Sequence, residues 1–124
     1  QNPHIHFLGK VPHRVLLEIL KDSQLFCLPT TYPEGLPTVI LEAGYFGVPV
    51  IATDMGGINE VISDNKTGKI IPPDDPESLQ SAILELIRDE EERNTLGAEL
   101  QKKISAEFTW QKTAQEVKKI IESI

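Results

Sequence analysis

Residues 25–53 read LFCLPTTYPEGLPTVILEAGYFGVPVIAT, and this stretch decides the fold. Two short apolar runs, at residues 25–28 and 48–53, enclose it. Such runs are typical of strands that are covered on both faces, as in a parallel sheet. Between them we predict a helix at residues 37–46, which Gly47 ends. The order of strand, helix and strand predicts a right-handed βαβ unit.

The start of this helix has the features of an anion-binding site. Pro37 suits the first helical position. An N–H at this position has no acceptor within the helix, so proline loses nothing by lacking one. The preceding Leu36 has no side-chain acceptor, so the backbone N–H groups of Thr38 and Val39 have no local partner. Free amides and the helix dipole together favour a bound phosphate.

Two glutamates flank this predicted phosphate site. Glu42 lies among apolar residues of the same helix, where a carboxylate needs hydrogen-bond donors, and the adjacent hydroxyls of a ribose supply two. Glu34, in the preceding loop, would reach a group on the far side of the phosphate. This layout predicts a sugar nucleotide as the ligand. Alternatively, residues 33–37 form only a turn and Glu42 pairs with a Lys or Arg; the residues alone leave both interpretations open.

The remainder of the chain continues the alternation of strands and helices. Strands are predicted at residues 5–8 and 68–71, and the second lies at a sheet edge because two prolines follow it. Apolar stripes and capping residues predict further helices at residues 12–21, 58–62, 76–87, 89–104 and 109–123. The expected fold class is α/β, a parallel sheet of about four strands flanked by helices, with ligands at the carboxyl ends of the strands.

Length and charge exclude several classes of function. A chain of 124 residues accommodates one domain. Its net charge of -7 argues against nucleic acid or anionic lipid as a partner, because both attract clustered Lys and Arg. The sequence has no signal-peptide pattern and no apolar run that could span a bilayer, so we expect a soluble, cytoplasmic protein.

Cysteine and histidine give no predicted reactive or metal site. Cys27 lies inside an apolar run, and we interpret it as a core residue. His4 and His6 alternate onto one face of a predicted strand, but no third ligand accompanies them. We therefore predict no bound metal.

Short motifs follow one another along nearly the whole chain. They are FLGKV at 7–11, EGLP at 34–37, EA at 42–43, GVPVIAT at 47–53, GGINE at 56–60, TG at 67–68, PPDDP at 72–76 and FTW at 108–110. In this order they resemble the C-terminal, donor-binding lobe of glycosyltransferase family 4 (group 1), whose members are retaining enzymes of the two-lobed GT-B fold. The resemblance implies a partial Rossmann-like sheet that lacks its first strands. It also favours the ligand interpretation of the two glutamates.

The resemblance implies a role for individual residues. Glu34 corresponds to the catalytic glutamate that contacts the donor sugar near the reacting carbon, and Glu42 to the one that accepts from the ribose diol. Val11 corresponds to the position whose backbone faces the nucleotide base. The distal phosphate and sugar would be held by the loop and helix start, which comprise Gly35, Leu36, Pro37 and Thr38. Pro37 replaces a glycine of many relatives and removes one possible donor.

The activity that the resemblance implies is transfer of a sugar from a nucleoside diphosphate sugar to an acceptor hydroxyl, with retention at the anomeric carbon and without a metal or other cofactor. In the family, a cationic pair on the diphosphate precedes the first strand seen here, and the active-site histidine belongs to the other lobe. Because the chain begins at Gln1 rather than at methionine, we expect the donor half of a longer enzyme, inactive by itself. We expect the parent enzyme in the cytoplasm, free or peripheral to a membrane.

Two alternatives to a catalytic donor lobe remain. One is a noncatalytic nucleotide- or phosphate-binding module. The other is an unrelated flavodoxin-like domain, a fold that does not require the pattern of residues 34–53. The partners expected of the catalytic lobe are a nucleotide sugar and the missing N-terminal acceptor lobe.

The absent first strands have a consequence for the sheet. In the strand order 3-2-1-4-5-6, residues 5–8 are strand three and residues 25–28 are strand four, and the two strands between them are missing. We expect residues 5–8 to shift against residues 25–28, to pair with a second copy, or to fray. In the family the helix at residues 109–123 packs toward the other lobe. Its apolar side, like the open strand edge, would then favour self-association.

Overall fold

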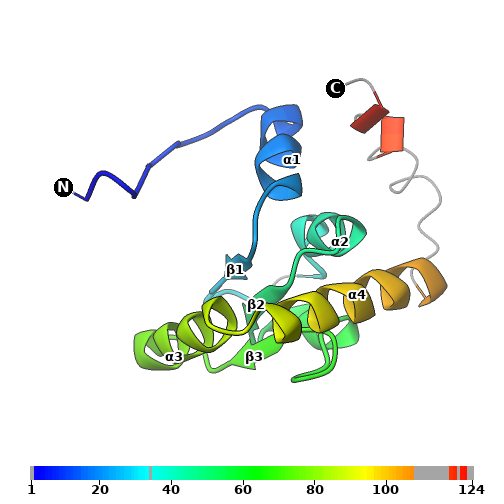
Figure 1. Ribbon diagram of the computed structural model, residues 1–124. Helices are drawn as coiled ribbons and strands as arrows, with labels where there is room; N and C mark the ends of the chain where they lie inside the picture. The colour runs from blue at the N-terminus through cyan, green and yellow to red at the C-terminus, as the bar shows by residue number, and fades with distance from the viewer. Residues whose placement is uncertain (1, 34, 108–117, 120, 123–124) are drawn as a thin grey trace.

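The computed structural model describes residues 2–33, 35–107, 118–119 and 121–122 (Figure 1). Along the chain its elements are α1 (His13–Lys21), β1 (Phe26–Leu28), α2 (Thr38–Tyr45), β2 (Val50–Thr53), the 3-10 helix η1 (Gly56–Glu60), β3 (Lys69–Ile71), α3 (Pro76–Ile87) and α4 (Glu90–Glu107). Strands and helices alternate as predicted, and the α/β fold class is confirmed. No helix in this part of the chain is both long and apolar enough to cross a membrane.

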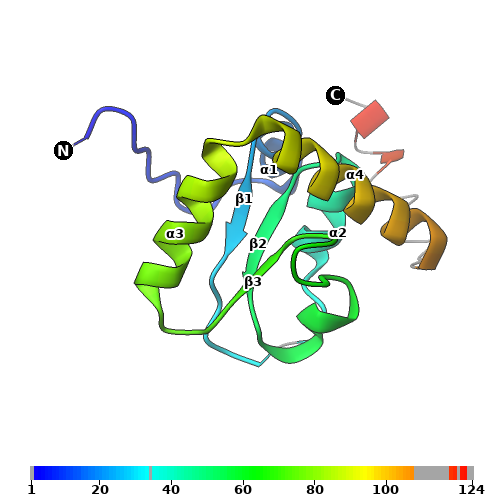
Figure 2. The same cartoon turned by 60° about the horizontal axis from the view of Figure 1, so that its bottom comes forward.

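The described strands form one parallel sheet in the order β1-β2-β3. Cys27 of β1 lies opposite Ile51 of β2, and Ala52 of β2 lies opposite Ile70 of β3. Figure 2 shows the strands side by side, with α2 and α3 flanking them. Because every strand points the same way, the loops that leave their carboxyl ends meet at one edge of the sheet.

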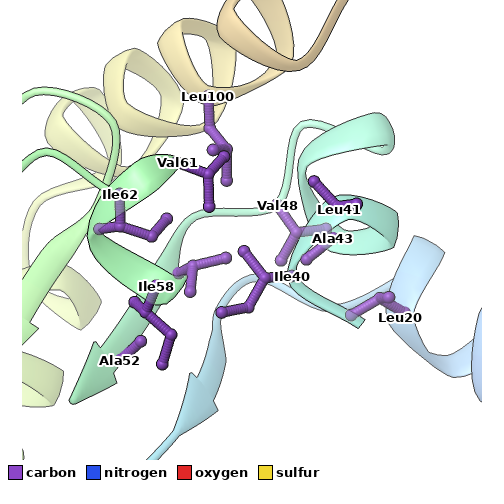
Figure 3. Close-up of a cluster of buried hydrophobic side chains, with 11 residues drawn as sticks. Leu20, Ile40, Leu41, Ala43, Val48, Ala52, Ile58, Val61, Ile62 and Leu100 are labelled. Carbon is purple, nitrogen blue, oxygen red and sulfur yellow. The ribbon is translucent and has the colours of Figure 1, made fainter. Parts of the chain in front are cut away.

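Alternate residues of β2 point into two separate hydrophobic cores. On one side, Val50 and Ala52 join a cluster drawn from α1, α2, η1 and α4 (Figure 3). On the other side, Ile51 packs with Leu86 of α3 and Leu96 of α4. Burial of β2 on both faces explains why residues 48–53 are continuously apolar.

Two glycines allow α4 to cross the end of α2. A Cβ on Gly97 of α4 would lie 2.0 Å from the carbonyl oxygen of Gly47, so no larger residue fits there without a backbone shift. A Cβ on Gly44 of α2 would lie 2.1 Å from Cδ1 of Ile104. Gln101 fixes the crossing by donating a hydrogen bond from Nε2 to the carbonyl oxygen of Tyr45 at 2.8 Å. The position of α4 therefore depends on close backbone packing.

The prediction of a strand at residues 5–8 is wrong. These residues form no strand and run away from the sheet at the N-terminal end (Figure 1). Phe7 is 90% exposed. The described residues therefore form a sheet of three strands rather than four, and β1 has a strand neighbour on one side only. A strand needs a partner for its backbone groups, and among the outcomes expected for this segment the structure shows the unpaired one.

Smaller differences concern where the elements begin and end. The predicted helix at residues 37–46 starts at Thr38, with Pro37 at the N-cap position. The helix expected at residues 58–62 is the 3-10 helix η1, two residues earlier. The helix expected at residues 109–123 lies outside the described residues, apart from 118–119 and 121–122.

Candidate functional site

The loops after β1 and β2 are tied together at the carboxyl edge of the sheet. Thr53, the last residue of β2, is buried, and its Oγ1 donates a hydrogen bond to the carbonyl oxygen of Thr30 at 2.6 Å. A pocket of about 190 Å³ opens at this edge and is lined in part by Thr31, Thr53 and Asp74. The Thr53–Thr30 hydrogen bond fixes the start of the loop that leads from β1 to α2.

The N-terminus of α2 is free of side-chain caps. Pro37 adopts an extended conformation (φ -66°, ψ 129°), and no side chain caps the helix. Counting partners among the described residues only, the first bonded amide is that of Ile40, which donates to the carbonyl oxygen of Pro37 at 3.2 Å. Within the part of the chain that the structure describes, the amides of Thr38 and Val39 donate to no acceptor. The start of α2 therefore combines the positive end of the helix dipole with two amides that have no partner among the described residues.

The loop before α2 rests on the turn that begins η1. A Cβ on Gly57 would lie 3.0 Å from the backbone nitrogen of Leu36 and 3.3 Å from the carbonyl carbon of Gly35. Only glycine lets these two backbone segments approach so closely without displacing one of them. The sequence showed Gly56 and Gly57 as a turn, but nothing in the sequence placed that turn against residues 35–36.

Glu42 is buried in α2 and has a partner from α1. Its side chain is 3% exposed, and its Oε2 accepts a hydrogen bond from Nε2 of His13, whose side chain is 48% exposed. The sequence offered Lys or Arg as the alternative partner of Glu42, and the partner in the structure is a histidine instead. Val11, two positions before His13, is half-buried.

The other predicted site residues lie in one continuous segment. Gly35 is exposed, and Leu36 and Pro37 are half-buried at the start of α2, where Thr38 is exposed. Glu34, the predicted catalytic residue, lies outside the described residues. Glu42 thus lies on the helix whose start has no side-chain cap, and His13, two positions after Val11, contacts it.

A second polar cluster joins β3 to the last helices. Lys69 Nζ lies 2.5 Å from Oε2 of Glu85, 2.7 Å from Oε1 of Glu92 and 2.5 Å from Oδ1 of Asn65. Burial on its own lowers the pKa of Lys69. The hydrogen bonds and charges of the two carboxylates together outweigh this effect, so the pKa of Lys69 is raised. The hydrogen bond from Lys69 lowers the pKa of Glu85. Because every charge here has a partner, we interpret the cluster as a structural cross-link.

Within the described ranges, neither cysteine nor histidine belongs to a cluster that could hold a metal ion. No group of three or more His, Cys, Asp or Glu side chains that could hold a metal occurs among the described residues. Cys27 is partly buried and packs against the core on the α3 side. Burial raises the pKa of its thiol, which favours the neutral form.

The described residues thus form an α/β domain in which an uncapped helix start and a buried carboxylate follow a strand of a parallel sheet, and a helix start of this kind is suited to an anion. The chain belongs to the glycosyl transferases group 1 family, whose model matches residues 1–103. It is 34% identical to an uncharacterized glycosyltransferase of Methanocaldococcus jannaschii over 121 residues, which are 98% of this chain and 34% of that protein. It is 28% identical to the D-inositol 3-phosphate glycosyltransferase of Corynebacterium urealyticum, over 97% of this chain and 28% of that protein.

Solved structures of glycosyltransferases share the fold. Sucrose-phosphate synthase from Thermosynechococcus elongatus matches 95% of this chain and 29% of its own, with a TM-score of 0.79 and 28% identity. Anabaena HepE in complex with UDP-glucose matches 86% of this chain and 29% of its own, with a TM-score of 0.73 and 25% identity. The chain thus spans about a third of the length of the proteins it matches. The group 1 family and its fold, inferred from the motifs, are confirmed.

Proposed function

We propose that this chain is the C-terminal, donor-binding lobe of a retaining glycosyltransferase of family 4, which moves a sugar from a nucleoside diphosphate sugar to an acceptor hydroxyl. The observation that carries the proposal is the uncapped start of α2 close to the buried carboxylate of Glu42, in a chain of the group 1 family. The binding of UDP and UDP-glucose by Anabaena HepE supports a nucleoside diphosphate sugar as the donor.

The start of α2 has a direct role in the proposed chemistry. When the bond between sugar and diphosphate breaks, negative charge builds up on the departing phosphate. The free amides of Thr38 and Val39 and the positive end of the helix dipole stabilise that charge. Because these donors are held by the backbone, they need no rearrangement as the charge develops. The chain therefore contributes electrostatic stabilisation of the leaving group.

The residues around the helix start hold the rest of the donor. In the proposal, Glu42 accepts hydrogen bonds from the ribose hydroxyls, and the backbone at Val11 faces the base. Glu34 contacts the sugar next to the reacting carbon, and Gly35 and Leu36 bring the backbone close to the distal phosphate. Gly57 keeps that loop in place by its contact with Leu36. No metal and no other cofactor enters the proposal.

The chain spans about a third of its relatives, so the activity of the whole enzyme is part of the proposal. The acceptor site and the remaining groups on the diphosphate would come from the other lobe, and this lobe alone would be inactive. We propose that the parent enzyme works in the cytoplasm, free or at the membrane periphery. A noncatalytic module is distinguished by nucleotide binding without sugar transfer.

Binding of nucleoside diphosphates tests the role of Glu42. The protein expressed from its whole gene is titrated with UDP, GDP and ADP, and the parent is compared with Glu42→Ala and the isosteric Glu42→Gln. We expect the nucleotide that the parent binds most tightly to bind at least about tenfold more weakly to both variants, because a hydrogen bond to a charged group is lost. Glu91→Ala, on the exposed face of α4, is the matched control and should bind as the parent does. Equal affinity for all four proteins would remove Glu42 from the site.

A further inference from the structure

We propose that His13 is a positioning residue for the donor's ribose and acts through Glu42. The inference rests on the proposed function, because it assigns the ribose to Glu42. His13 is the first residue of α1, and its Nε2 donates a hydrogen bond to Oε2 of Glu42 in α2. The pair thus connects the segment that holds Val11 with the helix that holds the phosphate-binding amides.

The two members of the pair differ in their access to solvent. The side chain of Glu42 is 3% exposed, and that of His13 is 48% exposed. The carboxylate lies beneath the surface and the imidazole lies at it. The histidine ring is thus the member of the pair that a ligand coming from solvent can contact more readily.

The hydrogen bonds of the carboxylate leave room for a ligand. An ionised carboxylate has about four lone-pair sites on its two oxygens, and the ring of His13 occupies one of them. Among the described residues no other side chain or amide donates to the carboxylate of Glu42. His13 holds one oxygen in place, and the other remains for the diol.

His13 is not needed to hold α1 against α2. Leu17 and Leu20 of α1 are buried, and Leu20 joins the same cluster as Leu41 and Ala43 of α2 (Figure 3). A half-exposed imidazole adds little to that apolar contact. Its contribution is the orientation of a carboxylate that would otherwise have no donor among the described residues, since buried charged groups keep a fixed geometry only when hydrogen-bonded.

The test compares a nucleotide with its 2′-deoxy counterpart. The protein expressed from its whole gene is titrated with UDP, GDP and ADP; the tightest binder and its 2′-deoxy form are then measured on the parent, His13→Ala, His13→Gln and Arg14→Ala. The quantity compared is the dissociation constant of the 2′-deoxy form divided by that of the ribonucleotide. Gln is the conservative variant because its Nε2–H can replace that of the imidazole. Arg14 is the exposed neighbour on α1 and serves as the control.

The parent should prefer the ribonucleotide by about tenfold. In His13→Ala we expect the ratio to fall close to one, with little change in affinity for the 2′-deoxy form, because the phosphate-binding amides are untouched. His13→Gln should recover most of the preference, and Arg14→Ala should match the parent. A purely structural role would not move this ratio selectively.

Three outcomes would overturn the inference. An unchanged or increased ratio in His13→Ala would show that the ring does not orient Glu42 or that it blocks the ribose. Loss of cooperative unfolding in both His13 variants would make His13 a structural residue. If the parent binds none of the three diphosphates, the proposed function itself fails and the role of His13 fails with it. Binding with an unchanged ratio refutes the role of His13 alone.

Discussion

At the scale of single residues, Gly57 and Gly68 are two glycines at which an added side chain would press on different parts of the molecule. A Cβ on Gly57 would press on the backbone of Leu36, in the loop proposed to hold the donor. A Cβ on Gly68 would lie 2.8 Å from the carbonyl oxygen of Val50, inside the sheet. The first contact shapes the site and the second shapes the fold.

Alanine at these two positions should therefore affect two different properties, nucleotide affinity at position 57 and stability at position 68. We expect Gly57→Ala to weaken binding of the preferred nucleoside diphosphate by about tenfold, with a small change in unfolding free energy. We expect Gly68→Ala to lower the unfolding free energy by about 1–3 kcal/mol, because overpacking strains the strands, and to leave nucleotide affinity of the folded protein near that of the parent. Titration calorimetry and urea unfolding measure the two effects. The same pattern in both variants would contradict the assignment.

At the scale of secondary-structure elements, the ion pairs of Lys69 connect β3 to α3 and α4. The hydrogen bond from Lys69 lowers the pKa of Glu85, so the unfolded protein binds more protons than the folded one in acid. The stability that the carboxylate contributes is present above its ordinary pKa and is lost as the pH falls through the lowered, folded-state pKa. The raised pKa of Lys69 acts at the other end of the scale: its contribution is present at neutral pH and is lost at strongly alkaline pH.

Glu85→Gln should flatten the acid limb of the stability curve. Between about pH 5 and pH 3, the unfolding free energy of the variant should fall less than that of the parent, because one group with a lowered pKa has been removed. Glu77→Gln, on the exposed part of the same helix, is the control. Denaturant unfolding at several pH values provides the curves. Parallel curves for Glu85→Gln and the parent would show that the pair does not contribute to acid stability.

The elements that the sequence predicts well are those whose cause is local. The apolar run of β2, the capping Asp75 with Pro76 of α3, and Gly47 after α2 each determine a boundary through their own chemistry. Residues 5–8 have a strand-like pattern as well, but a strand also requires a neighbour, and the described residues supply none. Pattern alone cannot show whether that neighbour is present.

The site follows the same division between local and tertiary causes. The lack of a side-chain cap at the start of α2 could be predicted, because Leu36 and Pro37 have no side-chain acceptor. The pairing of His13 with Glu42 could not, because 29 positions separate them and only the packing of α1 on α2 brings them together. The contact between Gly57 and Leu36 and the ion pairs of Lys69 are tertiary in the same way. For the contact between Gly57 and Leu36, the sequence offered one signal, the adjacent glycines 56 and 57, which indicate a turn but not what the turn packs against.

At the scale of the whole molecule, the N-terminal segment leaves apolar surface uncovered. Ile5, Phe7 and Leu8 are exposed, and β1 next to α1 has an open edge among the described strands. Exposed apolar side chains and an open strand edge both favour association. We propose that residues 1–124, produced alone, self-associate through this surface.

Light scattering after size exclusion tests this proposal. The mass of the isolated chain should exceed that of the monomer at high concentration, and Phe7→Asp should shift it toward the monomer. Tyr32→Asp, which places the same charge at another exposed aromatic residue, is the control and should not. A monomer at every concentration would contradict the proposal.

The whole-molecule interpretation depends on one arrangement, in which the start of α2 faces a diphosphate and Glu42 faces the ribose beside it. A crystal structure of the protein expressed from its whole gene, with its preferred nucleoside diphosphate bound, tests this most directly. We predict phosphate oxygens about 2.7–3.2 Å from the amide nitrogens of Thr38 and Val39, and a ribose hydroxyl at that distance from Glu42. A nucleotide bound elsewhere, with both amides on protein acceptors and Glu42 in contact with His13 alone, would contradict it.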